Sequence, residues 1–274
     1  MTSNSLPGTA LVTGASSGIG ATYADRLARR GYDLILVARN RERLDAAAER
    51  LARDHGVKVD VLAADLTQHE DVLRVEARLR SDAAITMFVN NAGMGSGSAL
   101  KDETDLDLLD RMVAVNVVAA NRLAIAAVQA FLARDRGTIV NTASVVALSP
   151  HFFNGTYSAS KSFVLTFTES LAGELQGTNV RLQAVLPGLT RTEIFERAGG
   201  SVDALDPEKV MDVSDLVDAA LAGLDQGELI TIPSLADAGL YDGYIAARDA
   251  LGPHLSLRKP AARYGVTDAA SDAA

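Results

Sequence analysis

The 274-residue sequence predicts a doubly wound α/β protein, in which a parallel sheet of about seven strands lies between two layers of helices. Three observations support this fold class. Short apolar, β-branched runs alternate with longer stretches of helical periodicity. The runs are apolar throughout, as expected of strands that helices cover on both faces. The first run leads directly into a glycine-rich turn that opens a helix.

The predicted elements follow one another in regular βα order. The expected strands are residues 10–13, 34–38, 57–63, 85–90, 138–142, 180–186 and 228–232. The expected helices are residues 19–30, 41–55, 70–81, 106–134, 157–176 and 214–225. Four glycines just past helical stretches are expected to be left-handed C-caps: Gly31, Gly56, Gly137 and Gly177. Right-handed crossovers then complete a three-layer α/β/α sandwich.

No linker or internal repeat interrupts this pattern, so the sequence predicts one domain over residues 1–260. Within it, residues 189–212 leave a strand at Pro187 and Gly188 and form a long polar connection, as is typical of a binding loop. Residues 261–274 end in Ala, Ser and Asp and are expected to form a flexible tail.

Composition excludes several chemistries. The chain has no cysteine, which removes disulfides, thiolate metal sites and a cysteine nucleophile. Four scattered histidines make a metal site unexpected. The net charge of −9 argues against nucleic-acid or anionic-membrane partners. No signal peptide or membrane-spanning run is expected, so a cytoplasmic protein is predicted.

The turn after the first strand has the composition of a phosphate-binding turn. Gly14 would let the chain turn sharply, Gly18 would let the backbone approach a pyrophosphate, and Gly20 would let the helix pack closely. The helix N-terminus would offer free N–H groups to the phosphates. The expected cofactor contacts of this turn are Gly14, Ser16, Ser17, Gly18, Ile19 and Gly20. The alternative is a turn that merely reverses the chain.

Further cofactor residues are expected at the ends of the next strands. Arg39 follows the second strand, where an acidic residue would favour NAD and an arginine favours the 2′-phosphate of NADP. Arg39 could instead be an ordinary solvated residue. Asp65 and Leu66 are placed to meet the adenine, although Asp65 could equally be the N-cap of the next helix. The run Asn91, Ala92 and Gly93 is expected against the ribose.

A tyrosine and a lysine carry the expected chemistry. Tyr157 and Lys161 are four residues apart and therefore share one helix face. The lysine ammonium and the positive nicotinamide ring of an oxidised cofactor would both lower the pKa of the phenol, which could then exchange a proton with a substrate oxygen. Ser144 would hold that oxygen, and Asn116 would relay protons to Lys161 through a water.

Each of these residues also has a structural interpretation. The Tyr157–Lys161 pair could be a surface contact, Asn116 could fix a helix kink, and Ser144 could be a strand-end hydroxyl. Their order downstream of a dinucleotide-type turn, at successive strand ends, favours catalysis.

Taken together, these motifs resemble the short-chain dehydrogenase/reductase family, in its compact single-domain, NADP-preferring branch. The resemblance covers residues 8 to 192 by motif, and to about 233 by element order. It implies a Rossmann-type fold, catalytic roles for Asn116, Ser144, Tyr157 and Lys161, and Thr190 near the nicotinamide carboxamide. It also implies cofactor contacts at Pro187 and Gly188, and a homodimer or homotetramer.

The expected activity is hydride transfer between NADP(H), or NAD(H), and an apolar carbonyl compound or secondary alcohol. The residues expected to border the substrate are Met94, Val145, Val146, Leu148, His151, Phe152, Phe153, Leu189, Ile194 and Phe195. Two alternatives stay open: an epimerase or dehydratase on the same fold, and a dinucleotide sensor without catalysis. The intact Ser144, Tyr157 and Lys161 set argues against the sensor.

Overall fold

The computed structural model describes residues 7–193 and 201–266, with Phe152 described by its backbone alone. The chain divides into two compact units, Met1–Ser234 and Leu235–Ala274, which are described separately below. The single domain predicted over residues 1–260 and the flexible tail after it remain predictions.

The first unit is built on a parallel sheet of seven strands in the order β3-β2-β1-β4-β5-β6-β7. The strands are β1 (Thr9–Thr13), β2 (Asp33–Ala38), β3 (Val59–Ala63), β4 (Ile85–Asn90), β5 (Gly137–Thr142), β6 (Val180–Val185) and β7 (Ile230–Thr231). The strand order reverses between β1 and β4, and a crevice at such a reversal is where open α/β sheets bind ligands. The predicted fold class is confirmed.

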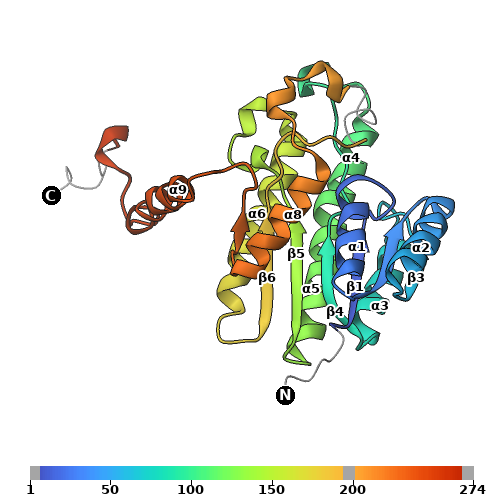
Figure 1. Cartoon of the computed structure of the whole chain (residues 1–274). Coiled ribbons are helices and arrows are strands. Elements are labelled where there is room, and N and C mark those ends of the chain that lie inside the picture. The colour runs from blue at the N-terminus through green and yellow to red at the C-terminus, as the bar shows by residue number, and fades with distance from the viewer. Residues whose placement is uncertain (1–6, 194–200, 267–274) are drawn as a thin grey trace. The chain divides into compact units, whose positions relative to one another are not determined.

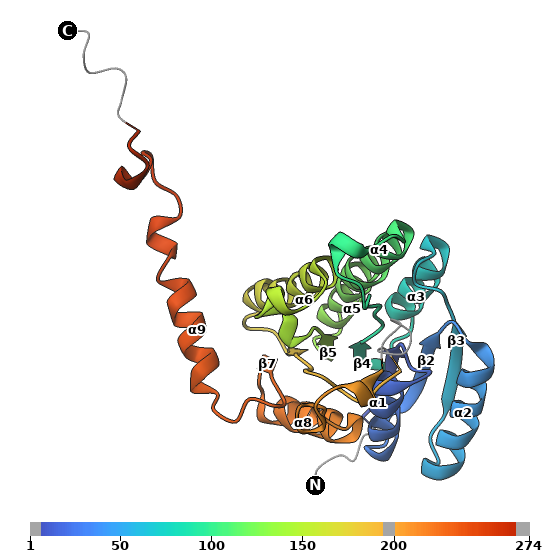
Figure 2. The ribbon, with the colours of Figure 1, turned by 90° about the horizontal axis from the view of Figure 1, so that it is seen from above.

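Helices cover both faces of this sheet (Figures 1 and 2). One face carries α1 (Gly18–Arg29), α2 (Arg41–His55) and α8 (Val213–Gln226). The other carries α3 (His69–Ser81), α4 (Leu106–Val113), α5 (Ala120–Leu132) and α6 (Gly155–Glu174). Each face has its own apolar core, with Tyr23 and Leu216 buried in one and Leu123 and Phe131 in the other. The sheet is therefore buried on both sides, which explains why its strands are apolar throughout.

The helix predicted over residues 106–134 is continuous in the sequence pattern but not in its geometry. A π-helical segment, η2 (Ala114–Ala119), separates α4 from α5 and contains Asn116. Such segments are frequent at functional sites. Leu106–Leu132 is also long and apolar enough to cross a membrane by length and composition, which the sequence analysis did not anticipate. However, 56% of its most apolar window is buried inside the protein, as in a core helix.

Three of the four predicted glycine caps have the left-handed conformation: Gly31, Gly56 and Gly177 have φ angles of 85°, 69° and 79°. The prediction for Gly137 is wrong, because this residue begins β5. A Cβ on Gly137 would lie 2.1 Å from Cγ of Phe131. A glycine is needed there because the Phe131 ring packs directly on the backbone.

The second unit contains α9 (Gly239–Asp249), which the sequence analysis did not predict. None of its residues is buried, and Leu240 and Tyr244 are exposed. A short 3₁₀ turn, Ala262–Tyr264, follows it.

Candidate active site

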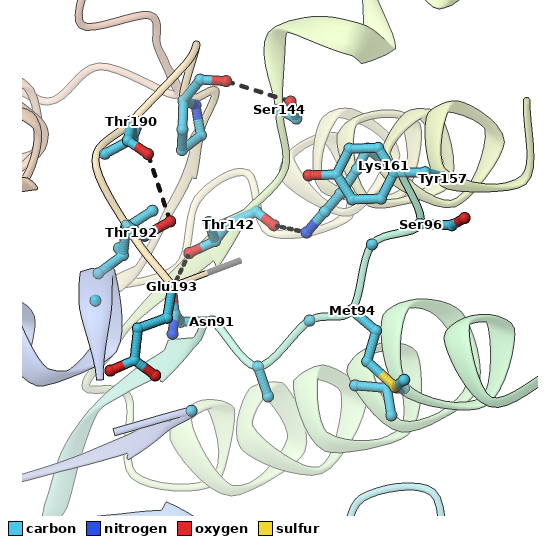
Figure 3. Close-up of a pocket in the computed structure, with 18 of the residues that line it drawn as sticks. Asn91, Met94, Ser96, Thr142, Ser144, Tyr157, Lys161, Thr190, Thr192 and Glu193 are labelled. Carbon is cyan, nitrogen blue, oxygen red and sulfur yellow. Dashed lines mark hydrogen bonds between the residues drawn. The ribbon is translucent and has the colours of Figure 1, made fainter. Parts of the chain in front are cut away.

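A cavity of about 1530 Å³ lies at the carboxyl ends of the strands of the first unit (Figure 3). Its wall includes every predicted catalytic and cofactor residue except Gly20 and Asn116. Typical small-molecule pockets are about 300–1,000 Å³. The cavity can therefore hold a dinucleotide together with a second molecule.

The glycine turn forms one end of the cavity. Gly14 and Gly18 have φ angles of 70° and 52°, which other residues rarely adopt. A Cβ on Gly20 would lie 2.3 Å from the carbonyl oxygen of Gly14, so Gly20 lets the turn fold back on itself. Ser17 is the N-cap of α1, and the helix N-terminus opens at the cavity wall. This arrangement fits a pyrophosphate.

Asn91 holds the turn to the neighbouring strand end. Its amide nitrogen donates to the carbonyl oxygen of Thr13 at 3.0 Å. The backbone N–H groups of Asn91 and Ala92 donate to the Thr13 hydroxyl at 2.9 and 3.1 Å. The side chain of Asn91 therefore shapes the cavity floor through β1, and Ala92 and Gly93 continue that floor without bulk.

Two arginines line the cavity beyond β2. Arg39 is exposed and forms no ion pair with any residue that the structure describes. Arg43, which the sequence analysis missed, lies in the first turn of α2 and pairs with Glu193 at 3.0 Å. Its place at the start of the helix that follows the β2 end was the signal that could have revealed it. Arg39 is thus open to an anionic ligand, whereas Arg43 would have to exchange its contact with Glu193 for one.

Asp65 lines the cavity but is not the N-cap of the following helix, because α3 starts at His69 with Gln68 at its N-cap. Its carboxylate instead accepts hydrogen bonds from the backbone and hydroxyl of Thr67, at 3.0 and 2.9 Å. This local turn fixes Asp65 and Leu66 at the end of the cavity near Arg39.

The proposed reactive residues meet between β5 and α6. Tyr157 lies in the first turn of α6, with the Lys161 side chain behind its ring in Figure 3. Nζ of Lys161 is 5.9 Å from the centre of that ring and donates to the carbonyl oxygen of Thr142 at 2.9 Å. The hydroxyl of Ser144 donates to the carbonyl oxygen of Pro187 at 3.2 Å and also hydrogen-bonds the Tyr157 side chain.

Burial dominates the electrostatics of this group. Burial raises the pKa of Tyr157, and the hydrogen bond with Ser144 opposes that rise. Burial also lowers the pKa of Lys161 to about 8. The protein alone therefore does not produce the lowered tyrosine pKa expected from the sequence. A low-dielectric pocket disfavours both charged forms, and a cationic ring above the phenol would be needed to reverse this for Tyr157.

Asn116 lies behind the cavity wall and braces the loop after β4. Its side chain accepts from the backbone N–H of Met94 at 2.8 Å and donates to the Met94 carbonyl oxygen at 2.9 Å. It also donates to the hydroxyl of Ser160 at 3.0 Å, and Ser160 donates to the Tyr157 carbonyl oxygen at 2.7 Å. Both amide protons of Asn116 are thus committed, and its proton-relay role stays a prediction. Sequence reasoning missed Ser160.

Most of the residues predicted to border the substrate line the cavity. Six expected residues line it: Met94, Val145, Val146, His151, Phe153 and Leu189. Leu148 packs on a neighbouring apolar cluster instead of lining the cavity. The Phe152 side chain, Ile194 and Phe195 lie outside the described residues. Leu100 and Leu205 also line the cavity, and their contribution could not be read from local sequence.

In the part of the chain that the structure describes, no group of three or more His, Asp or Glu side chains could hold a metal ion.

Comparison with known proteins agrees with this geometry. Residues 8–201 match the family model for short chain dehydrogenases. A very-long-chain 3-oxoacyl-CoA reductase of Anas platyrhynchos is 33% identical over 203 residues, which span 73% of this chain and 65% of that reductase. The chain belongs to the short-chain dehydrogenase/reductase family, whose members are oxidoreductases.

Two solved structures are similar over nearly the whole chain. One is a short-chain dehydrogenase from Sphingobium yanoikuyae in complex with NADPH, with 47% identity and a TM-score of 0.90, covering 94% of this chain and 100% of that one. The other is a bulky-bulky ketone specific alcohol dehydrogenase from Comamonas testosteroni, with 43% identity and a TM-score of 0.87, covering 95% and 99%.

Proposed function

We propose that this protein is an NADP(H)-dependent oxidoreductase that reduces bulky apolar ketones, or oxidises the corresponding secondary alcohols, with Tyr157 as the acid/base. The observation that carries the proposal is the placement of Ser144, Tyr157 and Lys161 in the wall of one cavity large enough for a dinucleotide and a substrate.

The cavity residues fit an NADP(H) molecule. The pyrophosphate would lie on the turn Gly14–Ile19, where positive φ angles and the N-terminus of α1 leave the backbone accessible. Arg39 and Arg43 would bind the 2′-phosphate. A Cβ on Gly93 would lie 3.4 Å from both Nζ of Lys161 and Oδ1 of Asn116, so a glycine leaves this floor open for the ribose. The NADPH complex of the related Sphingobium enzyme supports the same cofactor.

Nicotinamide in its bound form supplies or accepts the hydride. The Tyr157 phenol then donates a proton to the carbonyl oxygen during reduction, or removes it during oxidation. The Ser144 hydroxyl, which already hydrogen-bonds Tyr157, holds the same oxygen as charge develops on it. Lys161 would hold the ribose. Its ammonium, 5.9 Å from the centre of the phenol ring, favours the phenolate but does not by itself offset the burial that raises the Tyr157 pKa.

The proposed substrate class rests on the cavity and on a relative. Leu100, Val145, Phe153, Leu189 and Leu205 give the substrate end an apolar wall. The whole cavity, about 1530 Å³, exceeds the usual 300–1,000 Å³ of a small-molecule pocket, which supports a large substrate beside the dinucleotide. The specificity of the related Comamonas enzyme for bulky-bulky ketones supports this choice.

Replacing Tyr157 by Phe tests the catalytic assignment. We expect NADPH binding to persist, because the ring and its contacts remain, while kcat for a diaryl or long-chain ketone falls by at least about 10²-fold, the usual contribution of acid/base catalysis. Fluorescence titration with NADPH and initial-rate kinetics measure the two quantities. Turnover at the wild-type rate in Tyr157→Phe would refute the assignment.

We also infer a homo-oligomer and a cytoplasmic location. Val118, Ile125 and Leu132 are exposed apolar side chains spaced seven residues apart, so they share one side of the helix. An apolar stripe of this kind supports association through η2 and α5. The negative net charge supports the absence of nucleic-acid and membrane partners.

A further inference from the structure

Asn154 is a buried polar residue, 7% exposed, to which the proposed chemistry assigns no role. It is the N-cap of α6, and its side-chain oxygen accepts hydrogen bonds from the backbone N–H groups of Thr156 and Tyr157, at 3.0 and 3.2 Å. Tyr157 is thus the third residue of the helix, and Asn154 fixes its backbone directly.

The amide nitrogen of Asn154 contacts a different part of the chain. Nδ2 of Asn154 donates to the carbonyl oxygen of Ser98 at 2.8 Å, across 56 positions of sequence. Residues 96–100 line the same cavity as Tyr157, and Ser96 and Tyr157 are both drawn in Figure 3. The same two segments also touch at Gly155, where a Cβ would lie 2.9 Å from Cδ1 of Leu100.

A cap alone would not need an amide. Serine and aspartate cap helices as well as asparagine does. Aspartate cannot donate, and serine has a single side-chain oxygen where asparagine has an acceptor atom and a separate donor atom. An aspartate would place a carboxylate oxygen against the Ser98 carbonyl oxygen. The choice of asparagine therefore fits a link between two walls of the cavity.

We propose that Asn154 is a positioning residue, whose amide holds the Tyr157 backbone and the 96–100 wall at a fixed separation and so aligns a bulky ketone with the phenol. The inference rests on the proposed function. It predicts that breaking the Ser98 link impairs turnover even when the helix cap is kept.

Asn154→Ser separates the two roles, because the serine hydroxyl can still cap α6 but cannot bridge to Ser98. We expect kcat for a bulky ketone to fall roughly 10- to 100-fold, since a misplacement of about 1 Å costs that much. For a small ketone, which would make fewer contacts with residues 96–100, kcat should fall by a smaller factor. When kcat for ketone reduction is plotted against pH, its fall at alkaline pH should move to higher pH. A displaced Tyr157 would lose the Ser144 hydrogen bond that lowers its pKa.

Two comparisons keep the result interpretable. Asp105→Ala removes the equivalent cap of α4, where the Asp105 side chain accepts from Leu108 N–H at 2.9 Å. Leu108 lines the cavity, but Asp105 does not, and it makes no hydrogen bond to Ser98 or Tyr157. This substitution should lower the melting temperature without changing the ratio of bulky- to small-ketone turnover or the pH profile. Asn154→Asp also keeps the cap but cannot donate to Ser98, so its kcat for a bulky ketone should stay below that of the wild type, as in Asn154→Ser.

Amide hydrogen exchange provides a readout that does not depend on turnover. Exchange across residues 96–100 should accelerate in Asn154→Ser and stay at the wild-type rate in Asp105→Ala. The proposal is overturned if Asn154→Ser keeps wild-type exchange, pH profile and substrate ratio, or if Asn154→Asp restores them. A wild-type enzyme that reduces no ketone with NADPH would instead contradict the proposed function, while the exchange experiment would still report on the link.

Discussion

Lys161 is a buried amine that donates a hydrogen bond to the carbonyl oxygen of Thr142, and burial lowers its pKa from 10.5 to about 8. Below pH 8 the amine is protonated in both the folded and the unfolded chain, and the folded state bears the full cost of burying the charge. Between about pH 8 and 10.5 only the unfolded chain holds the proton. The contribution of Lys161 to the free energy of unfolding therefore rises with pH in this window.

Lys161→Met tests that electrostatic cost. The free energy of unfolding of Lys161→Met minus that of the wild type should decrease as the pH rises from 7 to 10, by up to about 3 kcal/mol. Urea denaturation at several pH values measures the difference, in which groups common to both proteins cancel. A difference that is constant or increases with pH would show that the amine is not strained by burial.

At the scale of one residue, tertiary contacts limited what the sequence could predict. The identities of Tyr157, Lys161 and Ser144 followed from local spacing and strand order. Asn154 and Ser160 could not be found in this way, because their partners, Ser98 and Asn116, lie more than forty positions away. The burial that raises the pKa of Tyr157 in the protein alone also cannot be read from the spacing of two residues.

At the scale of elements, α8 and β7 are joined by a close contact around Gly223. A Cβ on Gly223 would lie 2.4 Å from Oε2 of Glu228 and 2.5 Å from the hydroxyl oxygen of Thr231. Glu228 accepts a hydrogen bond from Thr231 at 2.7 Å, and Thr231 accepts one from Gln183 of β6 at 2.8 Å. An added methyl group would therefore disturb the polar connection at the edge of the sheet.

We expect Gly223→Ala to lower the free energy of unfolding by roughly 1–3 kcal/mol, as overpacking does. Gly173→Ala is a matched control, because Gly173 is exposed within α6 and a Cβ there meets nothing within 4 Å. The control should instead raise stability, by up to about 1 kcal/mol, through helix propensity. Denaturation midpoints of the two variants measure these changes. Equal shifts in both variants would contradict a destabilising contact at Gly223.

Element positions were predicted well where periodicity was strong. All seven strands form within two residues of their predicted starts. The break in the 106–134 helix was not predicted, because a π-helical segment keeps an apolar pattern while Asn116 binds the distant Met94 backbone. α9 was missed because its sequence contains Gly243 and gives a weak amphipathic pattern.

At the scale of the whole first unit, the cofactor cavity joins segments from both halves of the sheet. Its wall runs from the β1 turn through the ends of β2 and β4 to β5 and the loop after β6. A ligand that binds all of these only in the folded state must stabilise the entire unit. At a ligand concentration of 100 times the Kd, binding raises the free energy of unfolding by about 2.7 kcal/mol.

The melting temperature therefore measures cofactor preference without any turnover. In the wild type, NADPH should raise the melting temperature by several degrees, and more than an equal concentration of NADH does, because Arg39 would bind the 2′-phosphate. Arg39→Asp should reverse that order, since a carboxylate repels the phosphate and can accept a hydrogen bond from a ribose hydroxyl.

Arg41→Asp provides the control for the change in charge. Arg41 carries the same charge two residues away, but it pairs with Asp45 at 3.1 Å and does not line the cavity. If long-range electrostatics alone set the preference, the two substitutions would reduce the NADPH shift equally, and more so at low salt. If the phosphate binds at Arg39, only Arg39→Asp exchanges the order of the two cofactors. A wild type that NADH stabilises more than NADPH would refute the assignment of Arg39.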